Sequence, residues 1–154
     1  MQTTIQLDAK AVAALYDTDL YAWANINAEL LRQGKYQQMD VGHLIEEIED
    51  MGKSERRSIT SHFKNLLMHL LKWQYQPVLR NNSWLLTINN SRDHVADLIQ
   101  ENPSLATLPE TSLETIYAKA RRDAALETGL SLEAFPVKCP YVVDQAMTAD
   151  WLPS

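Results

Sequence analysis

The sequence predicts an all-α protein, an antiparallel up-and-down bundle of four to five helices with a loop-rich C-terminal segment. Apolar residues recur every three or four positions through most of the chain, whereas the alternation that is typical of strands is nearly absent. The four glycines and six prolines fall mainly at the edges of these periodic segments, where they end helices. Helices joined by short connections pack antiparallel, so a bundle is the expected architecture.

Length and composition favour one domain over residues 1–154. The chain is 45% hydrophobic and 22% charged with a net charge of −6, which is ordinary for a globular protein and excludes a disordered or low-complexity polymer. Neither a linker nor an internal repeat divides the sequence. We expect residues 1–15 to be loosely ordered and residues 130–154 to lie mostly as loop over the bundle.

The first two helices are marked by their ends. The first is expected over residues 18–33, and Gly34 is placed to end it in the left-handed conformation. Its inward face would consist of Leu20, Trp23, Ala24, Asn27, Leu30 and Leu31. The second is expected to start at Asp40, whose side chain can accept a hydrogen bond from the first turn, while Met39 and Leu44 form a hydrophobic staple.

The second and third helices share one apolar phase. This phase consists of Leu44, Ile45, Ile48, Met51, Ile59, Phe63, Leu66, Leu67, Leu70 and Trp73. Gly52 and Ser54 permit a break, although the continuous phase also permits one long helix. We expect a break or kink near Gly52. The segment ends at Pro77, because proline lacks a backbone N–H and disfavours helical geometry in the residue before it.

Capping residues predict where the later helices begin. Asn82 or Ser83 is expected to cap a fourth helix over residues 84–100. Residues 107–110 have the spacing of a capping box with proline in the first turn, so a fifth helix is expected from there to Gly129. In the remaining segment, the sequence predicts only a short helix near residues 144–148.

Six segments, in order, cover the chain from about residue 15 to its C-terminal end. They read LYDTDLYAWANINAELLRQGKY, LIEEIEDMGKSERR, LLMHLLKWQYQP, RNNSWLLTI, ETGL and FPVKCPY. This order and the tryptophan-rich segments resemble the domain of unknown function family 29, a family of bacterial and largely cyanobacterial proteins. The resemblance implies an all-helical single-domain protein with no established activity, so no catalytic residues can be carried over from it.

The second helix has two contrasting sides. At ~100° per residue, one polar side groups His43, Glu46, Glu47 and Asp50. The opposite side is apolar and groups Leu44, Ile45, Ile48 and Met51. We interpret the polar side as a solvated acidic face and the apolar side as the one directed inward.

A candidate polar site combines this helix with the third. Glu47 and Glu49 flank the apolar side of the second helix, and His62 and His69 follow the edge of the third. The two histidines are ~10.5 Å apart along one helix, too far to bind one metal ion together. His69 could meet Glu47 across the bundle as a proton-transfer pair, or it could be a core-edge histidine bonded to a backbone carbonyl. We expect no complete metal site and no cofactor.

A candidate interaction surface consists of Trp73, Tyr75, Arg80 and Trp84. Aromatic residues and arginine are enriched at binding hot spots, and arginine stacks on tryptophan. The alternative is that the tryptophans only anchor one end of the bundle. The net charge of −6 argues against nucleic acid as the partner, because phosphate contacts need clustered Lys and Arg.

No glycine-rich phosphate loop, nucleophile elbow, zinc-protease motif or paired C-x-x-C is present. The function that we expect is therefore that of a small helical protein-binding or adaptor module, acting through a protein partner or self-association, rather than that of an enzyme. The alternative is a ligand- or metal-binding bundle, or an enzyme, that uses His69 with a carboxylate of the second helix.

The cytoplasm is the expected location. The single cysteine, Cys139, cannot form an intrachain disulfide, and the first residues lack the basic and apolar regions of a signal peptide. No apolar stretch approaches the ~20 residues that a membrane span requires, so we expect no membrane partner.

Overall fold

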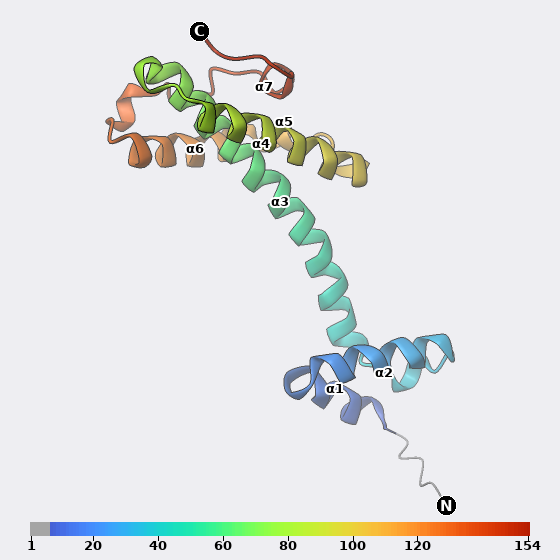
Figure 1. The fold of residues 1–154 in the computed structure, drawn as a ribbon. Helices are drawn as coiled ribbons and strands as arrows, with labels where there is room; N and C mark the ends of the chain where they lie inside the picture. The colour runs from blue at the N-terminus through green and yellow to red at the C-terminus, as the bar shows by residue number, and fades with distance from the viewer. Residues whose placement is uncertain (1–6) are drawn as a thin grey trace, which may run out of the picture. The chain divides into compact units, whose positions relative to one another are not determined.

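The computed structural model describes residues 7–154, which form helices joined by short turns (Figure 1). In this range the helices are α1 (Ala9–Thr18), α2 (Leu20–Arg32), α3 (Val41–Tyr75), α4 (Asn82–Glu101), α5 (Leu108–Thr111), α6 (Leu113–Thr128) and α7 (Val143–Met147). Four 3₁₀ turns connect them: η1 (Tyr36–Gln38), η2 (Pro77–Leu79), η3 (Pro103–Leu105) and η4 (Leu132–Ala134). The described range contains no strand, which confirms the predicted all-α class.

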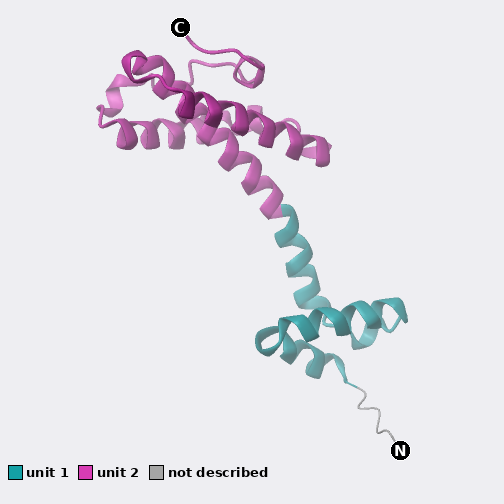
Figure 2. Cartoon of the chain, in the orientation of Figure 1, with its two compact units in different colours: residues 1–52 teal, residues 53–154 magenta. Residues whose placement is uncertain are grey.

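The chain divides into two compact units, residues 1–52 (unit 1) and residues 53–154 (unit 2), as coloured in Figure 2. Helix α3 begins in unit 1 and ends in unit 2. The expectation of a single domain stays a prediction. No helix in the described range has both the length and the apolar character that crossing a bilayer requires.

Unit 1 starts with a helix that the sequence interpretation missed. Asp8 caps α1 by accepting a hydrogen bond from the Ala11 N–H at 2.8 Å, and Val12 is fully buried. The segment from residue 9 to 15 is therefore helical rather than loose, whereas residues 1–6 lie outside the described range. Asp19 then separates the two helices and caps α2 through the Ala22 N–H, 3.0 Å away.

The end of α2 confirms the prediction for Gly34, which has a φ of +69°. The N–H of Gly34 bonds to the carbonyl of Leu31 at 3.1 Å, and that of Lys35 bonds to Leu30 at 2.9 Å. This pair of bonds is a Schellman motif. The predicted inward face of α2 is too wide, because Leu20, Ala24 and Leu31 are exposed and only Trp23 and Asn27 are buried.

Asp40 is the polar centre of unit 1. Its carboxylate accepts a hydrogen bond from Trp23 Nε1 at 2.8 Å, and its backbone N–H donates to Asn27 Oδ1 at 3.0 Å. The same carboxylate accepts the His43 N–H in the first turn of α3 at 3.4 Å, as the predicted cap requires. Asn27 can be buried because its amide is hydrogen-bonded at both ends: Oδ1 accepts from the Asp40 N–H, and Nδ2 donates to the Trp23 carbonyl at 2.8 Å.

Helix α3 is continuous through Gly52, so the predicted break there is wrong. Glycine in a helix interior costs only about 1 kcal/mol relative to alanine, which flanking helical segments offset. Gly52 also lacks a positive φ, unlike Gly34 and Gly129. The helix ends at Tyr75, just before Gln76 and Pro77, as the sequence predicts.

The first turns of α3 are covered on their polar side. Tyr16 of α1 stacks on His43, with ring centroids 3.9 Å apart, and its hydroxyl donates to Glu47 at 2.5 Å. The apolar side is open instead. The exposed side chains are Val41 (50%), Ile45 (52%), Ile48 (66%) and Met51 (70%), which we call the apolar strip. The expectation that this side is directed inward is wrong, because α1 packs against the opposite face.

The hydrophobic core of unit 2 lies where α4 and α6 run beside the C-terminal half of α3 (Figure 1). From α3 it takes five fully buried residues that the apolar phase predicts: Ile59, Phe63, Leu66, Leu67 and Leu70. From α4 it takes Ile88 and Val95, from α6 Ile116, Tyr117, Ala120 and Ala124, and from the C-terminal segment Phe135, Tyr141 and Ala146.

The helix ends in unit 2 differ in detail from the predicted ones. Asn81, rather than Asn82 or Ser83, caps α4 by accepting the Trp84 N–H at 2.9 Å. Thr107 adopts a helical backbone and forms no cap, so the predicted capping box is wrong, and the expected fifth helix is divided into α5 and α6. Gly129 ends α6 in the left-handed conformation with a φ of +74°, as predicted.

The loop-rich C-terminal segment is attached to α4 by a buried arginine. Arg92 donates from Nε to the carbonyl of Ala146 at 2.8 Å and from Nη2 to the carbonyl of Trp151 at 2.5 Å. Ala146 belongs to α7, which lies within one residue of the short helix that the sequence predicts. Since the acceptors are backbone carbonyls, the segment is held through its main chain rather than through side-chain packing alone.

Candidate functional site

His69 is a buried residue in the core of unit 2. Its Nδ1 lies 2.9 Å from the carbonyl oxygen of Asn65, one turn earlier in α3. A carbonyl only accepts hydrogen bonds, so Nδ1 carries the proton. Burial lowers the pKa of His69 below 6.5. This environment matches the alternative in which His69 is a core-edge histidine bonded to the backbone.

His62 lies beside a histidine of α4, His94. Its ring stacks on that of His94 from α4, with centroids 4.4 Å apart and an angle of 22° between the rings. Burial lowers the pKa of His62, and the charge of His94 lowers it further. Protonation of His62 is therefore disfavoured, since its positive charge would be partly buried and would lie close to His94.

Glu47 lies in unit 1, where it accepts the hydrogen bond from Tyr16. This hydrogen bond is the main reason why the pKa of Tyr16 rises to about 12. Glu49 is exposed on the same helix. The predicted meeting of Glu47 with His69 assumed two facing helices, and that geometry is wrong because both residues belong to the single helix α3.

The sequence left a metal-binding bundle open as an alternative, although it offered no complete metal site. Within residues 7–154, no group of three or more His, Cys, Asp or Glu residues lies close enough to hold a metal ion. The histidines and acids considered above are engaged in stacking and hydrogen bonds instead. They do not converge on a shared point in the described part of the chain.

The four residues of the candidate interaction surface lie around the end of α3. The guanidinium of Arg80 is 5.0 Å from the ring centroid of Trp73, and its Nε donates to the Trp73 carbonyl at 2.8 Å. We call this group, with Tyr75 and Trp84, the aromatic–cation end. Turn η2 brings Arg80 back over Trp73, because Pro77 stops the helix and reverses the chain.

Lys72 contacts Trp84 at the aromatic–cation end. Its buried ammonium group lies 4.7 Å from the Trp84 ring centroid and 2.8 Å from Glu127 of α6. Tyr75 packs edge-on against Phe135, with centroids 5.4 Å apart. The next residues in η2 are open: Val78 is 94% exposed. The aromatic–cation end therefore combines preorganised side chains with an adjoining apolar residue in solvent.

A pocket of about 530 Å³ lies between the second half of α3 and the first turns of α6, entirely within unit 2. Four of its lining residues are cations: Arg56, Arg57, Lys64 and Lys119. Four others carry hydroxyl groups: Thr60, Ser61, Ser112 and Thr115. The ninth is the apolar Ile116, and no carboxylate lines the pocket. We call it the basic pocket.

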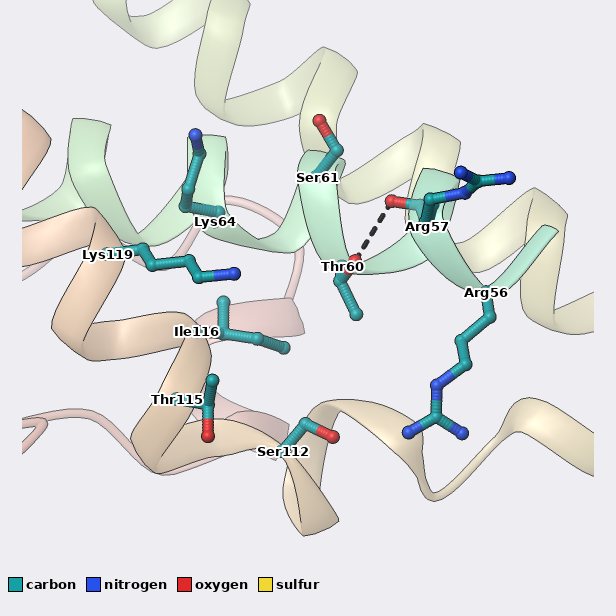
Figure 3. Close-up of a pocket in the computed structure, with 9 residues that line it drawn as sticks. All are labelled: Arg56, Arg57, Thr60, Ser61, Lys64, Ser112, Thr115, Ile116 and Lys119. Carbon is teal, nitrogen blue, oxygen red and sulfur yellow. Dashed lines mark hydrogen bonds between the residues drawn. The ribbon is translucent and has the colours of Figure 1, made fainter. Parts of the chain in front are cut away.

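Figure 3 shows how the two helices contribute to the basic pocket. Arg56 reaches from α3 and Lys119 from α6 into the space between the helices, with Ile116 beside Lys119, whereas the Arg57 guanidinium and the Ser61 hydroxyl point away from α6. The Thr60 hydroxyl donates to the Arg57 carbonyl at 2.9 Å. Its proton is therefore used within α3, and its oxygen can still accept a hydrogen bond. The arrangement offers positive charge and hydroxyls around an open hollow.

The sequence interpretation missed the basic pocket. A local signal was present: Arg57, Ser61 and Lys64 follow each other at four- and three-residue spacing, and so do Ser112, Thr115 and Lys119. What the sequence could not supply is the contact between these two faces, which lie about fifty residues apart in the chain.

Comparison with known proteins gives one result. No curated protein and no solved structure matches this chain. Residues 15–152, which are nearly the whole sequence, match the family described as Domain of unknown function DUF29. The match covers both compact units and agrees with the segments identified above. The chain therefore belongs to the DUF29 family.

Proposed function

We propose that this protein is a small helical protein-binding module, whose primary contact is the apolar strip on α3. The observation that carries this proposal is the exposure of Val41, Ile45, Ile48 and Met51 on one side of a single helix. Val41, the half-buried Leu44, Ile48 and Met51 have the spacing of the a and d positions of two heptads, and Ile45 occupies an e position beside them. Contiguous apolar surface on one helix face is typical of a docking site for another helix.

The negative charge around the apolar strip indicates which kind of partner it would bind. The segment from Val41 to Met51 contains four carboxylates and neither lysine nor arginine. A second copy of the same segment would bring like charges together along the contact. The proposed partner is therefore an amphipathic helix of another protein, with an apolar face flanked by Lys or Arg.

The test uses two synthetic helical peptides that share one apolar a/d face and differ only in Lys or Glu at the flanking positions. The Lys peptide is expected to bind the full chain, with an affinity that falls as salt rises, and the Glu peptide is not. Ile48→Ser with Met51→Ser should weaken the Lys peptide by roughly tenfold or more. Leu126→Ser is the matched control, because Leu126 is also apolar and exposed but lies on α6.

Two outcomes would contradict this surface. Equal binding of both peptides, or unchanged binding by the double variant, would remove the apolar strip as the contact. A dimer that sedimentation equilibrium detects in the wild-type chain and not in the double variant would make a second copy the occupant.

The aromatic–cation end is a second candidate surface for the same function. It is supported by the stacking of Arg80 on Trp73 and by the exposed Val78 beside it. Arg80→Ala with Trp84→Ala is expected to change the oligomeric mass or remove a co-purifying partner. If both stay unchanged in a protein with wild-type circular dichroism, this end only anchors the helices.

The proposed setting is the cytoplasm. Cys139 is the single cysteine of the chain, and burial raises the pKa of its thiol. A protonated, half-buried thiol reacts slowly and needs no disulfide partner, which suits a reducing compartment.

A further inference from the structure

We propose that the basic pocket of unit 2 binds a compact phosphorylated polyhydroxy compound, of the chemical class of the hexose phosphates. This inference goes beyond the protein-binding function above and uses different residues. The pocket volume of about 530 Å³ lies within the range of small-molecule sites. That volume is large enough for a phosphorylated sugar.

Most of the positive charge in the pocket has no carboxylate to balance it. In the described part of the chain, Arg56, Arg57 and Lys119 form no ion pair, whereas Lys64 pairs with Asp123 at 2.9 Å. The chain as a whole is acidic, with a net charge of −6, so this cluster runs against the average of the molecule. Neighbouring cations repel each other, and a bound anion removes that repulsion.

The cations have the geometry for phosphate. Arginine presents a planar fork that pairs with two phosphate oxygens, and lysine adds a mobile point charge. Ser112 is the first flanking residue of the 16-residue helix α6, and its hydroxyl makes no capping hydrogen bond. Ser112 also lines the pocket, so the positive end of the α6 dipole lies beside the same space and favours an anion.

The rest of the lining favours hydroxyls over an aromatic group. Ser61, Ser112 and Thr115 can donate hydrogen bonds to sugar hydroxyls and accept them, whereas Thr60 can only accept because its proton is bonded to the Arg57 carbonyl. Ile116 is the one apolar lining residue, and no aromatic side chain is available to stack on a base. Nucleic acid is disfavoured further because the surrounding chain is acidic.

The experiment titrates the full chain by calorimetry with glucose 6-phosphate, inorganic phosphate and glucose. Glucose 6-phosphate is expected to saturate one site and to bind more weakly at high ionic strength; inorganic phosphate should bind more weakly than the ester, and glucose not at all. Arg56→Gln with Lys119→Gln should weaken the ester by about tenfold or more, because it removes two charge-assisted contacts. Circular dichroism checks the fold, and both side chains are exposed.

The matched control is Arg32→Gln with Lys35→Gln, which makes the same change in net charge in unit 1 and should leave binding within twofold. Absence of saturable binding by the ester, or equal loss in both double variants, would overturn the proposal. Equal affinity for inorganic phosphate and the ester would rule out recognition of the sugar. Displacement of the ester by a short single-stranded oligonucleotide would overturn the assignment to a small molecule.

Discussion

At the scale of single residues, Asp40 and His43 form a closely coupled pair in unit 1, with His43 Nδ1 2.6 Å from the Asp40 carboxylate. Burial raises the pKa of Asp40, but hydrogen bonds from Trp23 and His43 outweigh burial and bring it below 3.8. The hydrogen bond to Asp40 raises the pKa of His43 above 6.5, against a smaller opposing effect of burial. Both groups are therefore held in their charged forms.

This pair predicts a pH optimum for the stability of unit 1. The contribution of His43 is complete below its unfolded pKa of 6.5 and is lost as pH rises through its higher folded value. The contribution of Asp40 is complete above 3.8 and is lost as pH falls through its lower folded value. Urea midpoints of unit 1 resonances should be highest between these limits. His43→Gln should flatten the alkaline limb, and an unchanged slope would exclude the pair as its cause.

Arg92 predicts a local effect at the C-terminal segment. Burial lowers its pKa, and within the described range its Nη1 is buried without a hydrogen-bond partner. Arg92→Met fills a similar volume and removes the two bonds to the carbonyls of Ala146 and Trp151. Amide exchange from residue 143 to 152 should accelerate by roughly a hundredfold or more, since the two bonds contribute about 1.5–3 kcal/mol each. Arg122→Met, at an exposed site, should leave it unchanged.

At the scale of the element, the continuity of α3 makes opposite predictions for two glycines. Alanine at Gly52 or Gly129 would have a Cβ with no atom within 4 Å, so packing does not distinguish the two sites. Gly52→Ala should stabilise α3 by about 0.5–1 kcal/mol, because glycine weakens a helix interior. Gly129→Ala should destabilise by roughly 1 kcal/mol, because its φ of +74° disfavours an L residue.

Thermal unfolding followed by circular dichroism measures both changes. A loss of stability in Gly52→Ala would indicate that the helix needs flexibility at this position. A stable Gly129→Ala protein would indicate that the end of α6 can adopt another conformation.

At the scale of the whole molecule, the distribution of the core makes unit 2 the self-sufficient part of the chain. The main hydrophobic cluster contains sixteen buried residues, from Ile59 to Ala146, and all of them belong to unit 2. A fragment of residues 53–154 should therefore be helical and unfold cooperatively by circular dichroism, because it retains that cluster. A fragment without a cooperative transition would show that unit 2 requires unit 1 to fold.

Local signals in the sequence were sufficient for part of the candidate site. Trp73, Arg80 and Trp84 are close in the chain, and Pro77 specifies the reversal that brings them together. The basic pocket could not be predicted in the same way, because Arg56 and Lys119 approach only when α3 and α6 pack. The suggested pair of Glu47 and His69 assumed two separate helices, whereas both residues belong to the continuous helix α3, because glycine permits a break without requiring one.

By itself the sequence determined the helical class, most helix ends and the core face of α3 in unit 2. These depend on neighbours within a turn or two: Asp40 caps its own helix, and Gly34 and Gly129 supply left-handed residues at theirs. Tertiary structure alone decided which side of a helix is covered. Apolar residues at a helical period indicate that a helix has an apolar side, but whether that side is buried depends on what packs against it. Because α1 packs against the polar side at His43 and Glu47, the apolar strip stays exposed to solvent.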